Sequence, residues 1–184
     1  GGWQTAEIKS VGKIATSDCD GPAGVNNFIT GTYGTPYPTE VLMAQTWNTD
    51  LLYDLGLAMG QEYADVNNYG VYGPAMNTHR SAFAGRNFEY YSEDGVLAGK
   101  LAAAQVNAMA TKGTYNYIKH FALNDQETNR CAFLLTYSNE QAIREIYLKP
   151  FELCIKNFDG TQIAVMSSFN WIGTVPACSN EDTL

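Results

Sequence analysis

Two short polar segments hold most of the side chains that could bind and transform a small polar molecule. Gly85–Asp94 (GRNFEYYSED) contains an arginine and three carboxylates, and Lys119–Arg130 (KHFALNDQETNR) contains a lysine–histidine pair, two acids and an arginine. Carboxylates accept hydrogen bonds, lysine and arginine donate them, and an aromatic ring can stack on a flat ligand. This combination is typical of a site that binds the hydroxyl groups of a sugar.

Other chemistries lack their characteristic residues. The sequence has no GxxxxGK[ST] phosphate-binding loop and no GxSxG nucleophile elbow. Only two histidines occur, His79 and His120, so a metal site would need mostly carboxylates, and the four cysteines form no CxxC pair. We therefore expect neither a metal ion nor a cofactor, and we interpret the cysteines as buried, reduced thiols.

The composition indicates a globular protein with negative charge. Apolar residues make up 45% and charged residues 16% of the 184 residues, which is enough for one domain with a sizeable core. The 11 basic and 19 acidic residues give a formal charge of −8, without any run of Lys or Arg. We expect no binding to nucleic acids or anionic membranes, because both need concentrated positive charge.

Four short apolar segments predict β-strands, and each leads into a polar loop. The predicted strands are Val11–Ser17, Tyr69–Met76, Tyr115–Leu123 and Gln162–Phe169. The first of them leads into a turn rich in Asp, Gly and Pro that contains Asp20.

The first predicted helix follows the first strand and its long loop. It begins at the capping residue Thr39, and its apolar positions recur every three to four residues as far as Val66. This spacing predicts that Trp47 and Met59 lie in the core.

Two further helices separate the remaining strands. One begins at Ser92–Asp94, is rich in alanine and ends before Gly113. The other begins at a capping box, Ser138–Gln141, and Pro150 is expected to kink or divide it. Its predicted buried side chains are Ile143, Ile146, Tyr147, Phe151 and Cys154.

The alternation of strands and helices predicts an α/β fold with a parallel sheet that is covered on both faces. Right-handed crossovers leave either a doubly wound sheet or a barrel. Because every predicted strand ends on a polar loop, we favour the (β/α)8 TIM-barrel type, whose sites lie at those ends. Residues 1–184 then form one partial barrel domain with about its first four β/α units. The first and fourth strands would be open edges, which predicts an oligomeric or poorly soluble chain.

The candidate residues also have structural interpretations. Asp20 can organise its Gly-Pro turn through a local hydrogen bond. Arg86 can brace its own loop by pairing with Glu89 or Asp94. His79–Arg80, just after the second predicted strand, is interpreted first as loop structure and only second as a pair of substrate contacts.

Six motifs occur in order along nearly the whole chain. They are DGPAGV at Asp20–Val25, TWNTDL at Thr46–Leu51, YGPAMNTHR at Tyr72–Arg80, GRNFEYYSED at Gly85–Asp94, KHFALNDQETNR at Lys119–Arg130 and VMSSFN at Val165–Asn170. Together they resemble the N-terminal barrel domain of family 3 glycoside hydrolases, the family of many β-glucosidases and β-xylosidases.

This resemblance implies sugar contacts for four polar residues. Asp20 would bind the hydroxyls at the far side of the glycosyl ring in the −1 subsite. Arg86, Lys119 and His120 would bind the other hydroxyls of the same ring.

The later motifs imply a wall of the pocket. Met166, which is a core residue by default on an apolar strand, would line that wall by analogy. Phe169 stands where the family usually has a tyrosine, so the aromatic surface is kept but a hydroxyl beside the nucleophile is lost. Glu127 and Arg130 fit their motif without an implied sugar contact.

The resemblance implies a retaining β-glucosidase that removes terminal non-reducing β-D-glucosyl residues from a β-glucoside or a short oligosaccharide, as in cellobiose degradation. Such enzymes use two carboxyl groups about 5–5.5 Å apart. The family's nucleophilic aspartate follows a later strand, and its acid/base glutamate normally comes from a separate domain, so we expect no catalytic residue in this chain. Both ends of the chain look cut, and we expect the remainder of the same enzyme to be its partner.

Alternatives remain open. One is a carbohydrate-binding or structural fragment without turnover, and another is part of a β-xylosidase. A different barrel enzyme would need its own carboxylate pair among Asp18, Asp20, Glu89, Asp125 and Glu127. Family members that act on N-acetylglucosaminides have a further histidine soon after the KHF segment, and its absence here favours the glucosidase and xylosidase branch.

Overall fold

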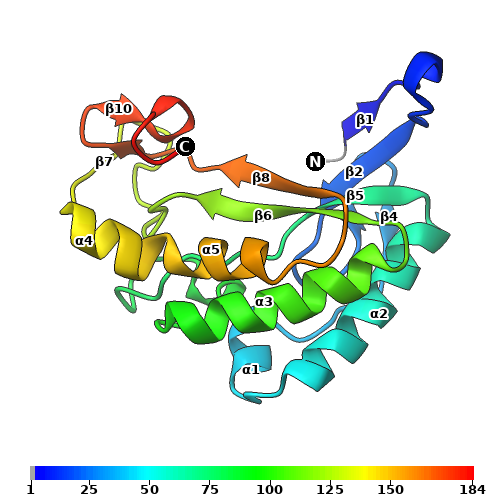
Figure 1. The fold of residues 1–184 in the computed structure, drawn as a ribbon, viewed down its shortest axis with the longest axis horizontal. Coiled ribbons are helices and arrows are strands. Elements are labelled where there is room, and N and C mark those ends of the chain that lie inside the picture. Colours follow the sequence, from blue (N-terminus) through cyan, green and yellow to red (C-terminus); the bar gives the residue numbers. More distant parts are fainter. Residues whose placement is uncertain (1–2) are drawn as a thin grey trace.

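The computed structural model describes residues 3–184, so Gly1 and Gly2 of the predicted domain lie outside the described residues. The fold is α/β, with a seven-stranded, mostly parallel sheet (Figure 1). No described helix has both the length and the apolar character needed to cross a membrane.

The strands are β1 (Trp3–Thr5), β2 (Thr16–Asp20), β3 (Asn26–Asn27), β4 (Thr32–Tyr33), β5 (Asn68–Tyr72), β6 (Tyr115–Phe121), β7 (Leu135–Thr136), β8 (Ile163–Ser167), β9 (Trp171–Ile172) and β10 (Val175–Pro176). The helices are α1 (Glu40–Ala44), α2 (Thr49–Asp65), α3 (Gly95–Ala110), α4 (Glu140–Ala142) and α5 (Lys149–Lys156), with short helices η1 (Lys9–Val11), η2 (Asn87–Glu89), η3 (Ile143–Tyr147) and η4 (Ala177–Ser179).

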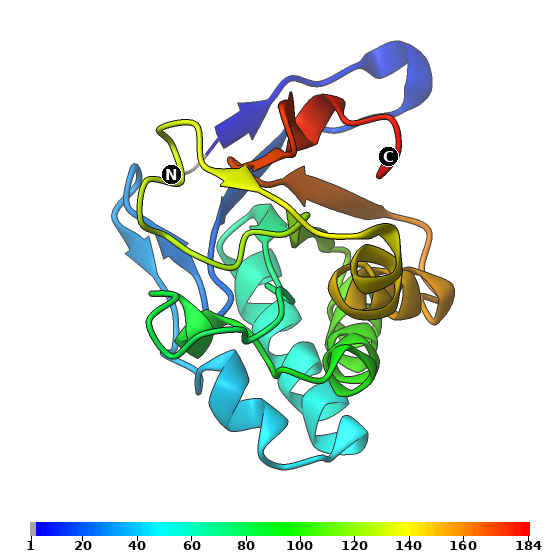
Figure 2. The ribbon, with the colours of Figure 1, turned by 90° about the vertical axis from the view of Figure 1, so that its left-hand side faces the viewer.

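Four parallel strands form the centre of the sheet. β2, β5, β6 and β8 are neighbours in this order, and every adjacent pair is parallel. The three longest helices, α2, α3 and α5, lie on one face of these strands (Figures 1 and 2). Right-handed crossovers between strands that are added in one direction place their helices on one side. The predicted α/β class is therefore confirmed, and among residues 3–184 these helices cover one face of the central strands.

The edges of the sheet differ from the prediction at one end. β1 and β3 both pair antiparallel with β2, and β4 continues the hairpin from β3. β2 is therefore not an open edge, whereas β8 pairs with β6 alone among the described strands. A second, small sheet of β10, β9 and β7 was not predicted. Oligomerisation or poor solubility of the chain stays a prediction.

The first strand lies later in the chain than predicted. Most of Val11–Ser17 is outside β2, because the backbone pairs with β1 only from Thr16 and with β5 only from Ser17. Cys19 is fully buried on the helix side, where it packs in the cluster that includes residues of α2. On the opposite side the buried Asp18 carboxylate accepts hydrogen bonds from the hydroxyls of Tyr115 and Tyr117, the latter at 2.9 Å. These two tyrosines lie about a hundred residues further along the chain, so no local sequence pattern indicates their contact with Asp18.

The single helix predicted from Thr39 is two helices, α1 and α2. The chain turns at Trp47, whose φ of 53° does not continue a right-handed helix. The Asn48 side chain then caps α2 by accepting two backbone N–H groups of its first turn. Trp47 is 73% exposed, so its predicted core position is wrong, whereas Met59 is buried as predicted.

The later helices follow the sequence signals more closely. Asp94 caps α3, and Gly113 follows its end with a φ of 82°. Asn139, rather than Ser138, caps α4 with its side chain. Pro150 lies in the first turn of α5, so the predicted division at this proline is confirmed. Of the predicted core side chains, Phe151 and Cys154 are buried, and the half-buried ones are Ile143, Ile146 and Tyr147.

The thiols are of two kinds. Cys19 and Cys154 are buried, and burial raises the pKa of their thiols to about 11 and about 12. Cys131 and Cys178 are exposed, so the prediction of buried thiols is wrong for these two.

Two glycines on the buried face of α2 allow α3 to approach closely. A Cβ atom added at Gly56 would lie 2.5 Å from the carbonyl oxygen of Gln105 and 2.8 Å from Cβ of Ala108. One added at Gly60 would lie 2.9 Å from Cα of Met109. Because these neighbours are backbone or short side chains, they cannot move aside.

We expect Gly56→Ala to lower the free energy of unfolding by about 2 kcal/mol, because the methyl group over-packs the α2–α3 contact. Alanine has the higher helix propensity by roughly 1 kcal/mol, so a purely local effect would have the opposite sign. Urea unfolding of the 184-residue chain measures the change. Ala58→Gly, at an exposed position of α2, is the control and should cost no more than about 1 kcal/mol.

Candidate functional site

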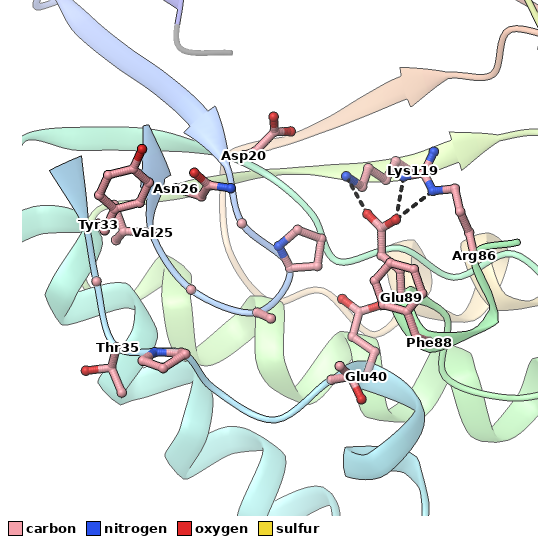
Figure 3. Close-up of a pocket in the computed structure, with 17 residues that line it drawn as sticks. Asp20, Val25, Asn26, Tyr33, Thr35, Glu40, Arg86, Phe88, Glu89 and Lys119 are labelled. Carbon is pink, nitrogen blue, oxygen red and sulfur yellow. Dashed lines mark hydrogen bonds and ion pairs between the residues drawn. The ribbon is translucent and has the colours of Figure 1, made fainter. Parts of the chain in front are cut away.

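A cavity of about 620 Å3 opens at the carboxyl ends of β2 and β6 (Figure 3). Asp20 is the last residue of β2, Lys119 lies near the end of β6, and Arg86 directly precedes η2 in the loop after β5. We call this the Asp20 cavity, and its lining residues are Asp20–Asn26, Tyr33–Pro36, Thr39, Glu40, Arg86, Phe88, Glu89 and Lys119. Three of the six predicted site residues therefore meet at one cavity.

A tyrosine of α2 makes hydrogen-bond contacts with the backbone of the turn after Asp20. The hydroxyl oxygen of Tyr63 lies 3.1, 3.0 and 3.1 Å from the carbonyl oxygens of Asp20, Gly21 and Gly24. Gly21 has a φ of 151°, and a Cβ atom there would collide with the Tyr63 hydroxyl. The close turn therefore needs glycine at this position. The turn in its place positions Asp20 at the cavity.

Glu89 joins the two cations of the cavity. Its Oε2 accepts a hydrogen bond from Arg86 Nε at 2.7 Å, and its Oε1 lies 2.8 Å from Lys119 Nζ (Figure 3). The Lys119 and Glu89 side chains are only 4% and 11% exposed. Of the two bracing partners considered for Arg86, the structure has Glu89, while Asp94 caps α3 instead.

A second carboxylate extends this network behind Arg86. Glu127 Oε1 lies 3.6 Å from Arg86 Nη1 and accepts a hydrogen bond from Asn124 at 3.1 Å. Its Oε2 lies 3.0 Å from Nε of Arg130, whose guanidinium is 5.0 Å from the ring centroid of Phe169. Arg86 is thus fixed by one carboxylate on each side.

His120 follows Lys119 in β6 and is uncharged at neutral pH. Its backbone N–H donates to Asn77 Oδ1 at 2.8 Å, and its Nδ1 lies 3.5 Å from the hydroxyl of Tyr90. Burial, together with the charges of Lys119 and Arg86, lowers the pKa of His120 to about 2. The ring therefore offers hydrogen bonds without a charge, and it does not line the Asp20 cavity.

The last two predicted residues lie farther along the chain and also outside the lining of the Asp20 cavity. Met166 is half-buried on β8, so it is not the fully buried core residue that its apolar strand indicates. Phe169 follows β8 and is 60% exposed. His79 supports its loop, because its Nε2 lies 2.9 Å from the carbonyl oxygen of Tyr90.

Three of the five carboxylates of the alternative barrel enzyme are held by other side chains. Asp18 is hydrogen-bonded to tyrosines, and Glu89 and Glu127 are ion-paired. Asp125 lines a different cavity. Asp20 and Glu89 share the Asp20 cavity, but Glu89 is occupied by two cations. No group of three or more His, Cys, Asp or Glu side chains within residues 3–184 is arranged to hold a metal ion.

One buried acid of the cavity has no signal in the sequence. Glu40, the first residue of α1, is 1% exposed, and both of its carboxylate oxygens lie 3.1 Å from the backbone nitrogen of Ala75. Burial and the nearby Glu89 raise its pKa well above the usual range, although Lys119 and Arg86 act in the opposite direction. An acid in a first helical turn is ordinary, so its sequence position carries no signal of this role.

Comparison with known proteins identifies relatives over almost the whole chain. Residues 9–184 match the family described as "Glycosyl hydrolase family 3 N terminal domain". The chain is 46% identical over 150 residues to beta-glucosidase A of Butyrivibrio fibrisolvens, covering 81% of this chain and 18% of that protein. It is 37% identical over 181 residues to beta-glucosidase B of Emericella nidulans, covering 97% and 21%. The chain thus spans about a fifth of the length of these relatives.

Solved structures agree with this match. Beta-glucosidase 3B from Thermotoga neapolitana in complex with glucose superposes with a TM-score of 0.86 at 39% identity, covering 98% of this chain and 26% of that one. DesR, a beta-glucosidase from Streptomyces venezuelae in complex with D-glucose, has a TM-score of 0.89 at 30% identity, covering 98% and 22%.

We expect Glu89→Gln to lower the free energy of unfolding by about 3 kcal/mol, because it leaves two largely buried cations without their shared carboxylate. The matched control is Glu140→Gln, whose carboxylate pairs with Arg144 at 2.9 Å on the surface. An exposed pair is worth at most about 1 kcal/mol. Equal losses for the two variants in urea unfolding would contradict the role given to Glu89.

We also expect His120 to make the fold sensitive to acid. The folded pKa lies below the ordinary value of 6.5, so the unfolded chain binds the proton first and stability is lost as the pH falls through 6.5. Between pH 7 and pH 5, the free energy of unfolding of the wild-type chain should fall by about 2 kcal/mol more than that of His120→Asn. Urea midpoints of both chains across this range measure the difference, and parallel pH profiles would contradict a buried neutral imidazole.

Proposed function

We propose that this chain, which belongs to glycosyl hydrolase family 3, supplies the glycone-binding part of a retaining β-glucosidase that removes terminal non-reducing β-D-glucosyl residues. The substrate would be a β-glucoside or a short oligosaccharide such as cellobiose. The observation that supports this most is the Asp20 cavity, where Asp20, Arg86 and Lys119 converge at the ends of parallel strands.

The proposal assigns complementary roles to these three side chains. The Asp20 carboxylate would accept hydrogen bonds from sugar hydroxyls, while Arg86 and Lys119 would donate them. Because Glu89 already holds both cations, little rearrangement is needed when a sugar enters. Hydroxyl contacts that tighten as the ring flattens toward an oxocarbenium ion would then lower the barrier by several kcal/mol.

The remaining predicted residues would complete the glycone subsite. His120 would add a hydrogen bond without charge, because its pKa is far below neutral. Met166 and Phe169 would form the wall on the β8 side, with the Phe169 ring exposed toward the ligand. A phenyl ring there keeps an aromatic surface but offers no hydroxyl.

We propose further that residues 1–184 are part of a (β/α)8 barrel, with β2, β5, β6 and β8 as its first four strands. In this arrangement the remainder of the enzyme would pair with β8 and would bring the nucleophilic aspartate and the acid/base glutamate. The 184-residue chain by itself would bind sugar without cleaving it. The lengths of the relatives support this reading, because the chain spans about a fifth of them.

We expect Asp20→Asn to weaken glucose binding by the chain about 10- to 100-fold, because hydrogen bonds to a charged acceptor contribute about 1.5–3 kcal/mol. Titration calorimetry or NMR titration with glucose measures the loss, and xylose in place of glucose distinguishes the β-xylosidase alternative. Asp50→Asn, on the exposed first turn of α2, is the matched control and should bind as the wild type does.

The same samples are assayed for release of nitrophenol from p-nitrophenyl β-glucoside. Binding without turnover agrees with the proposal, and addition of the remaining segments of the enzyme should restore turnover. Turnover by the 184-residue chain alone would contradict it, because the catalytic carboxylates would then lie within this chain. Glucose binding that is insensitive to Asp20→Asn would contradict the assigned site.

A further inference from the structure

A second cavity of about 630 Å3 lies beside the Asp20 cavity and shares none of its lining residues. The loops after β5 and β6 form it together with β7 and the end of η3. We call it the outer cavity, and its lining residues are Arg80, Ser81, Phe83, Ala84, Leu123, Asp125, Gln126, Thr128, Leu134–Tyr137 and Tyr147.

One thin wall separates the two cavities. The backbone N–H of Glu127 donates to the carbonyl oxygen of Ala84 at 2.9 Å, which joins the two loops. Gly85 has a φ of 96°, and a Cβ atom there would lie 3.2 Å from the Glu127 side chain. Ala84 faces the outer cavity, and Arg86, two residues on, faces the Asp20 cavity. The outer cavity is therefore adjacent to the proposed glycone site but distinct from it.

Asp125 is the carboxylate that lines the outer cavity. Its Oδ1 is buried without a hydrogen-bond partner among the described residues. Burial raises the pKa of Asp125 to about 7, although the Arg80 charge and a hydrogen bond from the Thr78 backbone lower it. As a lining carboxylate, Asp125 can accept a hydrogen bond from a ligand hydroxyl.

Aromatic rings supply the remaining surface of the outer cavity. Phe83 and Tyr137 are 95% and 71% exposed. The guanidinium of Arg80 lies 5.8 Å from the ring centroid of Tyr147, which holds this cation against an aromatic face. The polar side chains Gln126, Thr128 and Thr136 complete the lining with groups that both donate and accept hydrogen bonds.

The charges of the outer cavity indicate the class of ligand. Among the described residues, Arg80 and Asp125 are the charged side chains that line it, and their charges are opposite in sign. A cavity with one cation and one anion favours neither a phosphate nor a metal ion. Exposed rings, hydroxyls, an amide and one carboxylate suit a neutral ligand with several hydroxyls and a flat apolar face, which is the chemistry of a pyranose ring.

We infer that the outer cavity is a second carbohydrate-binding site of this chain. Asp125 accepts a hydrogen bond from a ring hydroxyl, Arg80 donates one, and the exposed ring of Tyr137 stacks on the sugar face. This site goes beyond the proposed glycone site, since it uses none of its residues. A chain with both sites holds two sugar rings on opposite sides of the wall formed by Ala84 and Glu127.

The test is an NMR titration of the isotope-labelled 184-residue chain with cellobiose. We expect two groups of shifted resonances, one around Asp20 and Lys119 and one around Arg80 and Tyr137. Tyr137→Ala should weaken binding at the outer cavity at least 10-fold and leave the first group unchanged. Because Tyr137 is largely exposed, this variant tests the site without disturbing the core.

Two further variants sharpen the comparison. Asp125→Asn keeps the size of the side chain and an acceptor but removes the charge, and it should weaken the outer site alone. Phe28→Ala removes another exposed aromatic ring, 61% exposed, that lines neither cavity, and it should change nothing.

The outcomes separate this inference from the proposed function. Shifts confined to the Asp20 cavity, or outer shifts that survive both Tyr137→Ala and Asp125→Asn, overturn the second site and leave the first intact. Shifts confined to the outer cavity support the second site and contradict the glycone assignment. A chain that shows neither group contradicts both.

Discussion

The candidate site depends on a single carboxylate that holds two cations from different parts of the fold. Lys119 comes from β6 and Arg86 from the loop after β5, and Glu89 lies within 2.8 Å of an atom of each. Two cations so close together and so little exposed would repel each other without it. Glu89 can reach both cations because β5 and β6 are neighbouring parallel strands. Their carboxyl ends, and with them Lys119 and the loop of Arg86, therefore lie at the same edge of the sheet. Glu127 and Arg130 extend the same alternation of charges around Arg86.

The fold was predictable where its signals are local. The Asp94 cap, the glycine after α3 and the division at Pro150 act within a few residues, and each occurs as expected. The first strand was misplaced because Asp18 is buried only with tyrosine hydroxyls that come from a distant strand. Trp47 was wrongly placed in the core because its spacing from other apolar residues fits a helix, whereas the backbone turns at this residue.

The candidate site was predictable to a similar extent. Asp20, Arg86 and Lys119 were selected from the resemblance to family 3 glycoside hydrolases, and their positions near the ends of parallel strands explain why they meet at one edge of the sheet. The sequence indicated that Arg86 pairs with either Glu89 or Asp94, but it did not distinguish between these two acids. The roles of Glu40 and Asp125 were not predictable, because each arises from burial by segments far away in the chain. Motif order identifies the family, whereas side-chain environments come only from tertiary structure.

A crystal structure of the chain with bound glucose would show directly whether the Asp20 cavity binds the glycone. We expect one ring in this cavity, with hydroxyl oxygens about 2.7–3.2 Å from the Asp20 carboxylate and from the nitrogens of Arg86 and Lys119. We also expect the pairs between Glu89 and these two cations to persist in the complex. A glucose ring bound elsewhere with the Asp20 cavity unoccupied, or one that enters only after Glu89 releases its cations, would contradict the proposed glycone site.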